Sequence, residues 1–302
     1  MLIILYGDFS KEENAKQQRM IDGQCTCGYR EYARNYGHII YLSPQKVKLS
    51  WEHSITNSKK IIEFISQYPD ALVWSVKHSS KKDKEILAKI NNKKVYYSCN
   101  SYNMYNPYCN ASLVDTKSRI KKNAKLWFKG KDPNYWKPND KPKEFDYLLM
   151  GRRGDKNEVY FLNRLNEIKS PRRILWIGGE KHKDKVSTNH EVVYTPFTSQ
   201  DNVRDNIIKA KVGVLFTELK AEGFPQSFLE MTICGVPVVY NEKGPRNEFY
   251  FHKYNHILCS KKNIVDAAEL LLKYRNPDKC RQVAINNYSL EKSFRRIVKC
   301  TK

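Results

Sequence analysis

Short apolar runs alternate with amphipathic segments along the first part of the chain. The runs at residues 2–6 and 71–76 are almost entirely hydrophobic and end at Gly or Lys, which is typical of buried strands. Isoleucines at positions 61, 62 and 65 recur at helical spacing. The pattern predicts strands at 2–6, 37–42, 71–76 and 94–98, and helices at 28–35, 58–68 and 81–91.

The alternation stops at residues 129–143 and then begins again. This stretch contains three prolines and little periodicity, which is typical of a linker. Beyond it, the pattern predicts strands at 145–150, 173–177, 192–194, 212–217 and 236–240. Helices are expected at 157–168, 200–209 and 264–274. A further helix is expected to begin directly after residue 225, and two more helical segments are expected between residue 274 and residue 302.

Strands separated by helices of about ten residues indicate parallel sheets covered on both faces. We therefore expect an α/β fold with two Rossmann-like lobes, at residues 1–140 and 141–285. A C-terminal helix at 286–302 is a candidate to cross back to the first lobe. Two such lobes place a ligand cleft between them, near the carboxyl ends of the strands.

Composition narrows the class of protein. With 302 residues, 40% of them hydrophobic, the chain is long enough for two packed cores. It has no apolar run of the roughly 18 residues that cross a membrane, and its first run is too short for a signal peptide, so we expect a cytoplasmic protein. Eight cysteines are scattered, and only Cys25 and Cys27 lie close together, so we expect reduced thiols and no metal site.

The net charge of +22 is spread over the whole chain. Residues 1–140 hold 24 basic and 13 acidic groups, and residues 141–302 hold 30 and 19. Such a field attracts polyanions, including nucleotide phosphates, nucleic acid and anionic lipid headgroups. A second interpretation stays open, in which the lysines reflect compositional bias and solvate the surface.

Two carboxylates stand eight positions apart in Glu222-Gly-Phe-Pro-Gln-Ser-Phe-Leu-Glu230, between two predicted strands. Glu230 follows Gln226 by four residues, so both occupy one helix face, and its side chain leans back towards the loop. The start of this helix offers free N–H groups and a positive dipole end to a diphosphate. The alternative is that Glu230 caps its own helix and Glu222 is a surface residue.

Five segments together resemble the retaining GT4-like glycosyltransferases of GT-B fold. Glu222-x7-Glu230, followed by Gly235-x-Pro237-Val-Val, resembles the donor-site signature of that family. Gly151-Arg-Arg-Gly-Asp-Lys156 resembles its Gly-Arg…Lys loop, and residues 130–138 and 37–40 resemble its first-lobe closing segment and second strand. The resemblance implies a GT-B fold, with an acceptor-side first lobe and a nucleotide-sugar-binding second lobe.

The resemblance implies that Glu230 binds the ribose of the donor and Glu222 binds the transferred sugar. The loop between them would complete the donor site with Gly223, Phe224, Pro225, Gln226 and Ser227.

Arg152 and Lys156 would neutralise the leaving diphosphate, beside Gly151. The spacing is one residue shorter than the usual pattern, so Arg153 is a candidate to share or replace the role of Arg152. The chain contains no Asp-x-Asp sequence. We therefore expect a metal-independent reaction with no cofactor beyond the nucleotide sugar, a UDP or GDP derivative.

Other site residues are less sharply marked. Gly244 is expected in the donor loop, and Gly28 either approaches the diphosphate or simply starts a helix. On the acceptor side, relatives carry a His where this chain has Cys99-Asn100, so Asn100, His78 and Tyr102 are the candidates.

The resemblance implies retention of configuration at the transferred sugar. For the acceptor, the charge and the tyrosines near Tyr102 favour a hydroxylated base in DNA, such as a hydroxymethyl base, over an envelope glycan or lipid-linked acceptor at an anionic membrane. The protein would then lie in the cytoplasm, peripheral to DNA or membrane. Two other classes stay open: a non-catalytic nucleic-acid-binding protein on this scaffold, and a sugar-nucleotide epimerase.

Overall fold

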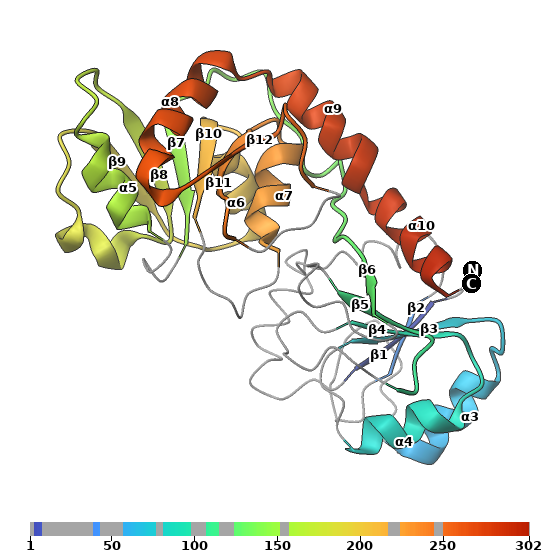
Figure 1. The fold of residues 1–302 in the computed structure, drawn as a ribbon. Coiled ribbons are helices and arrows are strands. Elements are labelled where there is room, and N and C mark those ends of the chain that lie inside the picture. Colours follow the sequence, from blue (N-terminus) through green and yellow to red (C-terminus); the bar gives the residue numbers. More distant parts are fainter. Residues whose placement is uncertain are drawn as a thin grey trace. The chain divides into compact units, whose positions relative to one another are not determined.

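Two parallel sheets organise the chain in the computed structural model (Figure 1). The structure describes residues 3–7, 39–42, 57–76, 81–97, 107–114, 124–151, 157–216, 224–244 and 250–301. The chain divides into two compact units, one formed by residues 1–130 with 290–302 and the other by residues 131–289. The boundaries thus lie near 130 and 290 rather than at 140 and 285, and most of the proline-rich stretch belongs to the second unit.

The sheet of the first unit has the strand order β2-β1-β3-β4-β5-β6, with every neighbouring pair parallel. Ile61 and Ile65 of one helix pack with Ile86 and Leu87 of the next in a common core. The elements are β1 Ile3–Gly7, β2 Ile39–Leu42, α3 Ser58–Ser66, β3 Leu72–Val76, α4 Lys81–Lys89, β4 Lys94–Tyr97, β5 Ala111–Val114, β6 Ala124–Leu126 and α10 Leu290–Cys300.

The last helix, α10, belongs to the first unit. The indole N–H of Trp127 donates to the carbonyl oxygen of Ser293 at 3.2 Å, and the Ser293 hydroxyl donates to the carbonyl oxygen of Phe128 at 2.5 Å. Trp127 also meets Trp74 of β3 edge to face, with ring centres 5.8 Å apart. Helix α10 therefore forms part of the core of the first unit, together with residues from the first half of the sequence.

The sheet of the second unit has the order β12-β11-β10-β7-β8-β9 and is also parallel throughout. Helix α8 packs against β10, β11 and β12 (Figure 1). The elements are β7 Phe145–Met150, α5 Glu158–Leu165, β8 Arg173–Ile177, η3 Glu180–Lys185, β9 Glu191–Thr195, α6 Gln200–Ile207, β10 Ala210–Leu215, α7 Gln226–Ile233, β11 Val238–Asn241, β12 His256–Cys259, η4 Lys261–Asn263, α8 Ile264–Tyr274 and α9 Pro277–Tyr288.

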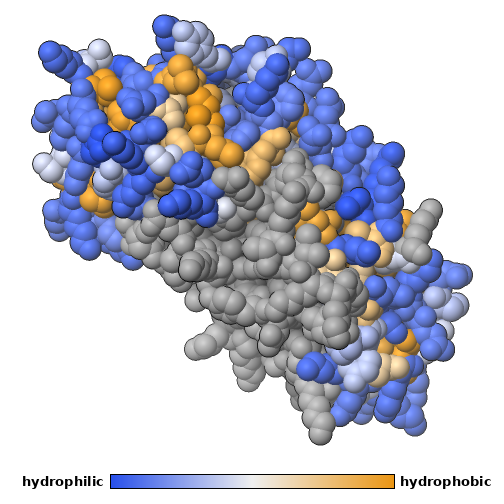
Figure 2. Space-filling model, viewed as in Figure 1, coloured by the Kyte–Doolittle hydropathy of each residue, from blue (hydrophilic) through white to orange (hydrophobic). Residues whose placement is uncertain are grey.

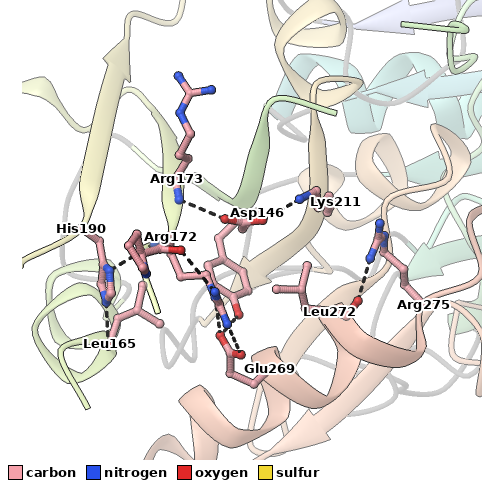
Figure 3. A network of polar contacts seen from close by, with 11 residues as sticks. Asp146, Leu165, Arg172, Arg173, His190, Lys211, Glu269, Leu272 and Arg275 are labelled. Atoms are coloured by element: carbon pink, nitrogen blue, oxygen red, sulfur yellow. Dashed lines mark hydrogen bonds and ion pairs between the residues drawn. The ribbon is translucent and has the colours of Figure 1, made fainter. Parts of the chain in front are cut away.

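A network of charged side chains joins the amino ends of the central strands of this unit to α8 (Figure 3). Asp146 accepts hydrogen bonds from Lys211 Nζ at 2.7 Å and from the backbone N–H of Arg173 at 3.0 Å. Arg172 donates to both oxygens of Glu269, at 2.8 and 2.6 Å. The network lies at the edge of the sheet opposite the carboxyl ends of the strands.

The expected parallel α/β architecture is confirmed, but the pattern missed several elements. Strands β5, β6 and β12 were not expected. The helix expected at 157–168 ends at Leu165, because Pro171 and the polar residues before it do not continue a helix. The helix expected at 28–35 lies outside the described residues.

Hydrophilic residues cover most of the described surface in the view of Figure 2. Within the described ranges, no helix is both long and apolar enough to cross a membrane. The cysteines that the structure describes, at 109, 234, 259, 280 and 300, are free thiols.

Candidate functional site

The second unit has a topological switch point between β7 and β10. These strands are neighbours, and from them the sheet grows outward to β8 and β9 on one side and to β11 and β12 on the other. In open parallel sheets, the loops at the carboxyl ends of two such strands separate and leave a crevice that binds ligands. The segments that follow β7, β10 and β11 therefore form the candidate site.

The segment after β7 begins at Gly151. Gly151 is buried, and its carbonyl oxygen accepts a hydrogen bond from the indole N–H of Trp176 at 3.3 Å. Helix α5 then starts after Asn157, which has the left-handed values φ 67° and ψ 16°. Asn is one of the few residues that adopt this conformation readily. Its side chain does not cap the helix, and among the described residues its buried Nδ2 has no hydrogen-bond partner.

The segment after β10 leads into α7 through an aromatic anchor. Phe224 is buried and stacks on Tyr250 with ring centres 4.2 Å apart, and it meets Phe228 edge to face at 5.1 Å. Pro225 follows at the N-cap of α7 and contributes no side-chain hydrogen bond. The N–H groups of the first turn are thus not capped by this residue, and the positive end of the helix dipole lies beside the switch point.

The first turn of α7 carries a buried polar side chain. Both Oε1 and Nε2 of Gln226 are buried, and neither forms a hydrogen bond with any residue that the structure describes. An unsatisfied buried amide is costly, so such a group in a native protein calls for a specific explanation. Ser227, the next residue, is half-buried. One turn further along the same helix face stands Glu230.

Glu230 forms a buried ion pair. Its Oε1 accepts a hydrogen bond from Nζ of Lys131 at 2.8 Å, and the two side chains are 11% and 4% exposed. Within the described ranges, the carboxylate has no other hydrogen-bond partner. Among the described residues, one oxygen of this carboxylate in the second turn of α7 is therefore left without a partner.

Lys131 is the first residue of a segment that Arg281 of α9 fastens to α7. The Arg281 guanidinium donates to the carbonyl oxygens of Trp136 and Pro133, both at 2.7 Å, and to that of Ile233 at the end of α7. Burial lowers the pKa of Arg281. Because one planar guanidinium donates to three carbonyl oxygens, it constrains the backbone positions of this part of the proline-rich stretch relative to α7. This part is therefore an ordered part of the second unit.

Gly244 lies in the turn after β11. Its N–H donates to the carbonyl oxygen of Asn241 at 3.0 Å, and a Cβ added here would come within 3.0 Å of the Tyr240 hydroxyl. The close approach of the Tyr240 side chain, which leaves little room for a Cβ, is thus one reason for glycine at this position, apart from any contact with a ligand.

The structure brings part of the expected donor site together. Gly151, Gln226, Glu230 and Gly244 all follow the carboxyl ends of the adjacent strands β7, β10 and β11. Phe224, Pro225 and Ser227 lie in the same segment at the start of α7. The remaining expected site residues lie outside the described parts of the chain: Gly28, His78, Asn100, Tyr102, Arg152, Arg153, Lys156, Glu222 and Gly223.

The sequence interpretation did not identify Lys131 and Arg281 as part of this arrangement. Lys131 lies 99 positions from Glu230, and Arg281 lies 145 positions from Trp136. A lysine after a glycine in a lysine-rich chain carries no distinctive signal. Only the folded packing reveals these partners.

Comparison with protein families gives a match that coincides with the second unit. The family model for glycosyl transferases group 1 matches residues 131–289, which are the residues of that unit. No curated protein matches the chain by sequence.

Solved structures share the fold over the whole chain. A glycosyltransferase from Rickettsia africae is 12% identical with a TM-score of 0.70, and 100% of this chain and 98% of that chain are covered. HepE from Anabaena in complex with UDP is 12% identical with a TM-score of 0.71, and 99% of each chain is covered. An α-glucosyltransferase in complex with UDP and a mismatched 13-mer DNA is 12% identical with a TM-score of 0.64, and 100% of each chain is covered.

These likenesses show that the chain has a GT-B fold. The family model matches more than half of the chain, within the unit that carries the candidate site. The chain therefore belongs to the glycosyl transferases group 1 family and is a glycosyltransferase.

Proposed function

We propose that the protein transfers a sugar, with retention of configuration, from a nucleoside diphosphate donor to a hydroxyl acceptor, and that the donor binds at the switch point of the second unit. One observation carries this proposal. Glu230 presents an oxygen with no partner among the described residues, beside a helix start that its N-cap residue leaves uncapped. A carboxylate can accept hydrogen bonds from ribose hydroxyls while the helix start receives the diphosphate.

Each expected residue has a chemical role in this proposal. Glu230 binds the ribose, the Gln226 amide forms hydrogen bonds with the donor, and Glu222 binds the transferred sugar. Arg152 and Lys156, with Arg153 as a further candidate, neutralise the diphosphate as the bond to the sugar breaks. Their contacts strengthen as negative charge develops on the leaving group, so they stabilise the transition state more than the ground state.

The reaction is proposed to run without a divalent metal, because the chain lacks an Asp-x-Asp sequence and offers cationic side chains for the diphosphate. Turnover with a suitable donor and acceptor should persist in excess EDTA, and the anomeric configuration of the product can be read by NMR. Loss of activity that added Mg²⁺ or Mn²⁺ restores would contradict metal independence, and an inverted product would contradict retention.

UDP sugars are the first donors to test, since UDP is bound in two of the similar structures, and GDP sugars are the second. A true donor at 100–1,000 times its dissociation constant should stabilise the protein against unfolding by roughly 3–4 kcal/mol. Glu230→Ala should abolish this protection. Glu191→Ala, which removes an exposed carboxylate paired with Arg173, is the matched control and should keep it. A panel in which no nucleotide sugar protects the wild type would overturn the proposal.

For the acceptor, we favour a hydroxylated base in DNA. The charge of +22, shared by both halves of the chain, suits a long polyanion, and one structure of similar fold contains DNA. Binding to duplex DNA should weaken roughly 1,000-fold between 50 and 200 mM salt if about six phosphates are contacted. Sugar should pass to DNA that contains hydroxymethylated bases and not to the same unmodified duplex.

An envelope acceptor at an anionic membrane is the competing outcome. Sedimentation with phosphatidylglycerol vesicles, together with indifference to duplex DNA, would favour it. Binding to DNA with no transfer of sugar to the hydroxymethylated duplex would contradict the DNA-base acceptor, even if the protein does not bind the vesicles.

A further inference from the structure

The ammonium group of Lys131 contacts one of the two oxygens of the Glu230 carboxylate. Nζ lies 2.8 Å from Oε1, and no hydrogen bond to Oε2 is found within the ranges that the structure describes. We propose that Lys131 is a positioning residue for donor binding, which holds Glu230 in the orientation that leaves Oε2 to the ribose hydroxyls. This role rests on the proposed function, because it requires that Glu230 binds ribose.

The position of Lys131 is closely defined. Its backbone N–H donates to the carbonyl oxygen of Tyr288 at 3.4 Å, and the residue forms a parallel bridge with Ser289. Its ammonium group lies 5.0 Å from the ring centre of Trp136, a favourable cation–π distance. Because Arg281 holds the carbonyl of Trp136, the lysine and its aromatic neighbour are fixed relative to α7.

The same unit contains the contrasting arrangement. Arg172 donates from Nε and Nη2 to the two oxygens of Glu269, so its fork occupies the whole carboxylate. An ammonium is a compact charge that satisfies one oxygen, whereas a guanidinium pairs with both at once. Lysine at position 131 therefore compensates the buried charge of Glu230 and still leaves it an acceptor.

A purely structural ion pair would behave differently from a positioning pair. Its loss would lower stability and weaken every ligand of the site alike. Loss of a positioning pair would weaken only those ligands that carry ribose hydroxyls. The ratio of two affinities therefore separates the roles, because a general loss of stability does not change it.

The test compares UDP with 2′,3′-dideoxy-UDP by calorimetry, or GDP with its dideoxy analogue if the wild type binds GDP instead. Hydrogen bonds to a charged group predict that the wild type prefers the ribose form by roughly 10- to 100-fold. In Lys131→Met this preference should fall below about threefold, while affinity for the dideoxy form stays within about threefold of wild type. Lys211→Met, which breaks the ion pair with Asp146 at the opposite edge of the sheet, is the matched control and should keep the full preference.

Lys131→Arg is the second variant, in case Lys131→Met does not fold. It keeps the positive charge, but its fork should occupy both oxygens of Glu230, so the variant should fold and lose the ribose preference. A full preference in either folded variant overturns the positioning role and leaves the proposed function intact. If both variants fail to fold, Lys131 is a structural residue and the positioning role is likewise overturned. If the wild type binds no nucleotide, or binds without discriminating, the proposed function of Glu230 itself fails.

Discussion

The hydroxyl of Tyr147 lies 2.6 Å from Oε1 of Glu269 and donates a hydrogen bond to it. Tyr147 is a buried residue of β7, and Glu269 belongs to α8, so this bond ties the central strand to the helix that packs across the sheet. Arg172 donates to the same oxygen and to Oε2 of this carboxylate. Helix α8 is thus fixed by directional bonds in addition to its apolar face.

Replacing Glu269 by Gln should destabilise the second unit by about 1–3 kcal/mol, since the amide loses the charge and cannot accept from all three donors. Denaturation in urea, followed by fluorescence, measures the change. Glu191→Gln, at an exposed pair with Arg173, should have a much smaller effect. Equal effects of the two substitutions would show that the Glu269 network is not special.

Acid should weaken the same network. The hydrogen bonds from Arg172 lower the pKa of Glu269 below its ordinary value of 4.5. Burial acts to raise the pKa of Asp146, but the hydrogen bonds from Lys211 and the Arg173 N–H outweigh it, so that pKa is lowered too. A carboxyl with a lowered folded-state pKa contributes stability above its unfolded-state value, and the contribution is lost as the pH falls through the folded-state value.

The melting temperature of the wild type should therefore drop steeply as the pH falls below about 4.5. Glu269→Gln, which has less of this contribution to lose, should show a shallower drop over the same range. Parallel curves for the two proteins would mean that Glu269 is not the group responsible.

Gln226 offers a test in which stability and binding separate. Its buried amide makes no hydrogen bond within the described parts of the chain, so Gln226→Leu should keep or slightly raise the stability of the protein. If the amide binds the donor, the same substitution should weaken nucleotide affinity roughly 3- to 10-fold, the cost of one ordinary hydrogen bond. Unchanged affinity would remove Gln226 from the donor site, and a marked loss of stability would mean that the amide has a structural partner.

Thiol reactivity should follow burial. Burial raises the pKa of Cys234, Cys109 and Cys259, each to about 12, so these thiols stay protonated at neutral pH. Alkylation of the native protein with iodoacetamide, mapped by mass spectrometry, should leave them unmodified until the protein unfolds. Cys300, which is only half-buried, should react before them. Rapid labelling of Cys234 without unfolding would contradict the packing around α7.

Much of the fold could be predicted because its central strands are mostly apolar and buried. Strand β7, Phe145–Met150, was expected over the same residues, since all of its residues except Asp146 are apolar. Strands β6 and β12 escaped prediction because they are three and four residues long and hold polar residues, so neighbouring strands rather than local preference define them.

Some features of the candidate site could also be predicted from the sequence, whereas others depend on tertiary packing. The family resemblance implied a donor-binding role for Glu230, and local spacing predicted that it shares a helix face with Gln226. Its partner Lys131 could not be predicted, because that contact depends on how the proline-rich stretch packs against α7 and α9. Burial of the Gln226 amide likewise follows from tertiary packing and leaves no trace in the sequence pattern.

The position of α10 has a consequence for biosynthesis. Ser293, which bonds to Trp127 and Phe128 of the first unit, is synthesised after residues 131–289, which form the second unit as one contiguous stretch. Domains tend to fold as units while the ribosome is still at work. The first unit is therefore expected to complete its core only after the whole second unit has been synthesised, although most of its own residues precede that unit.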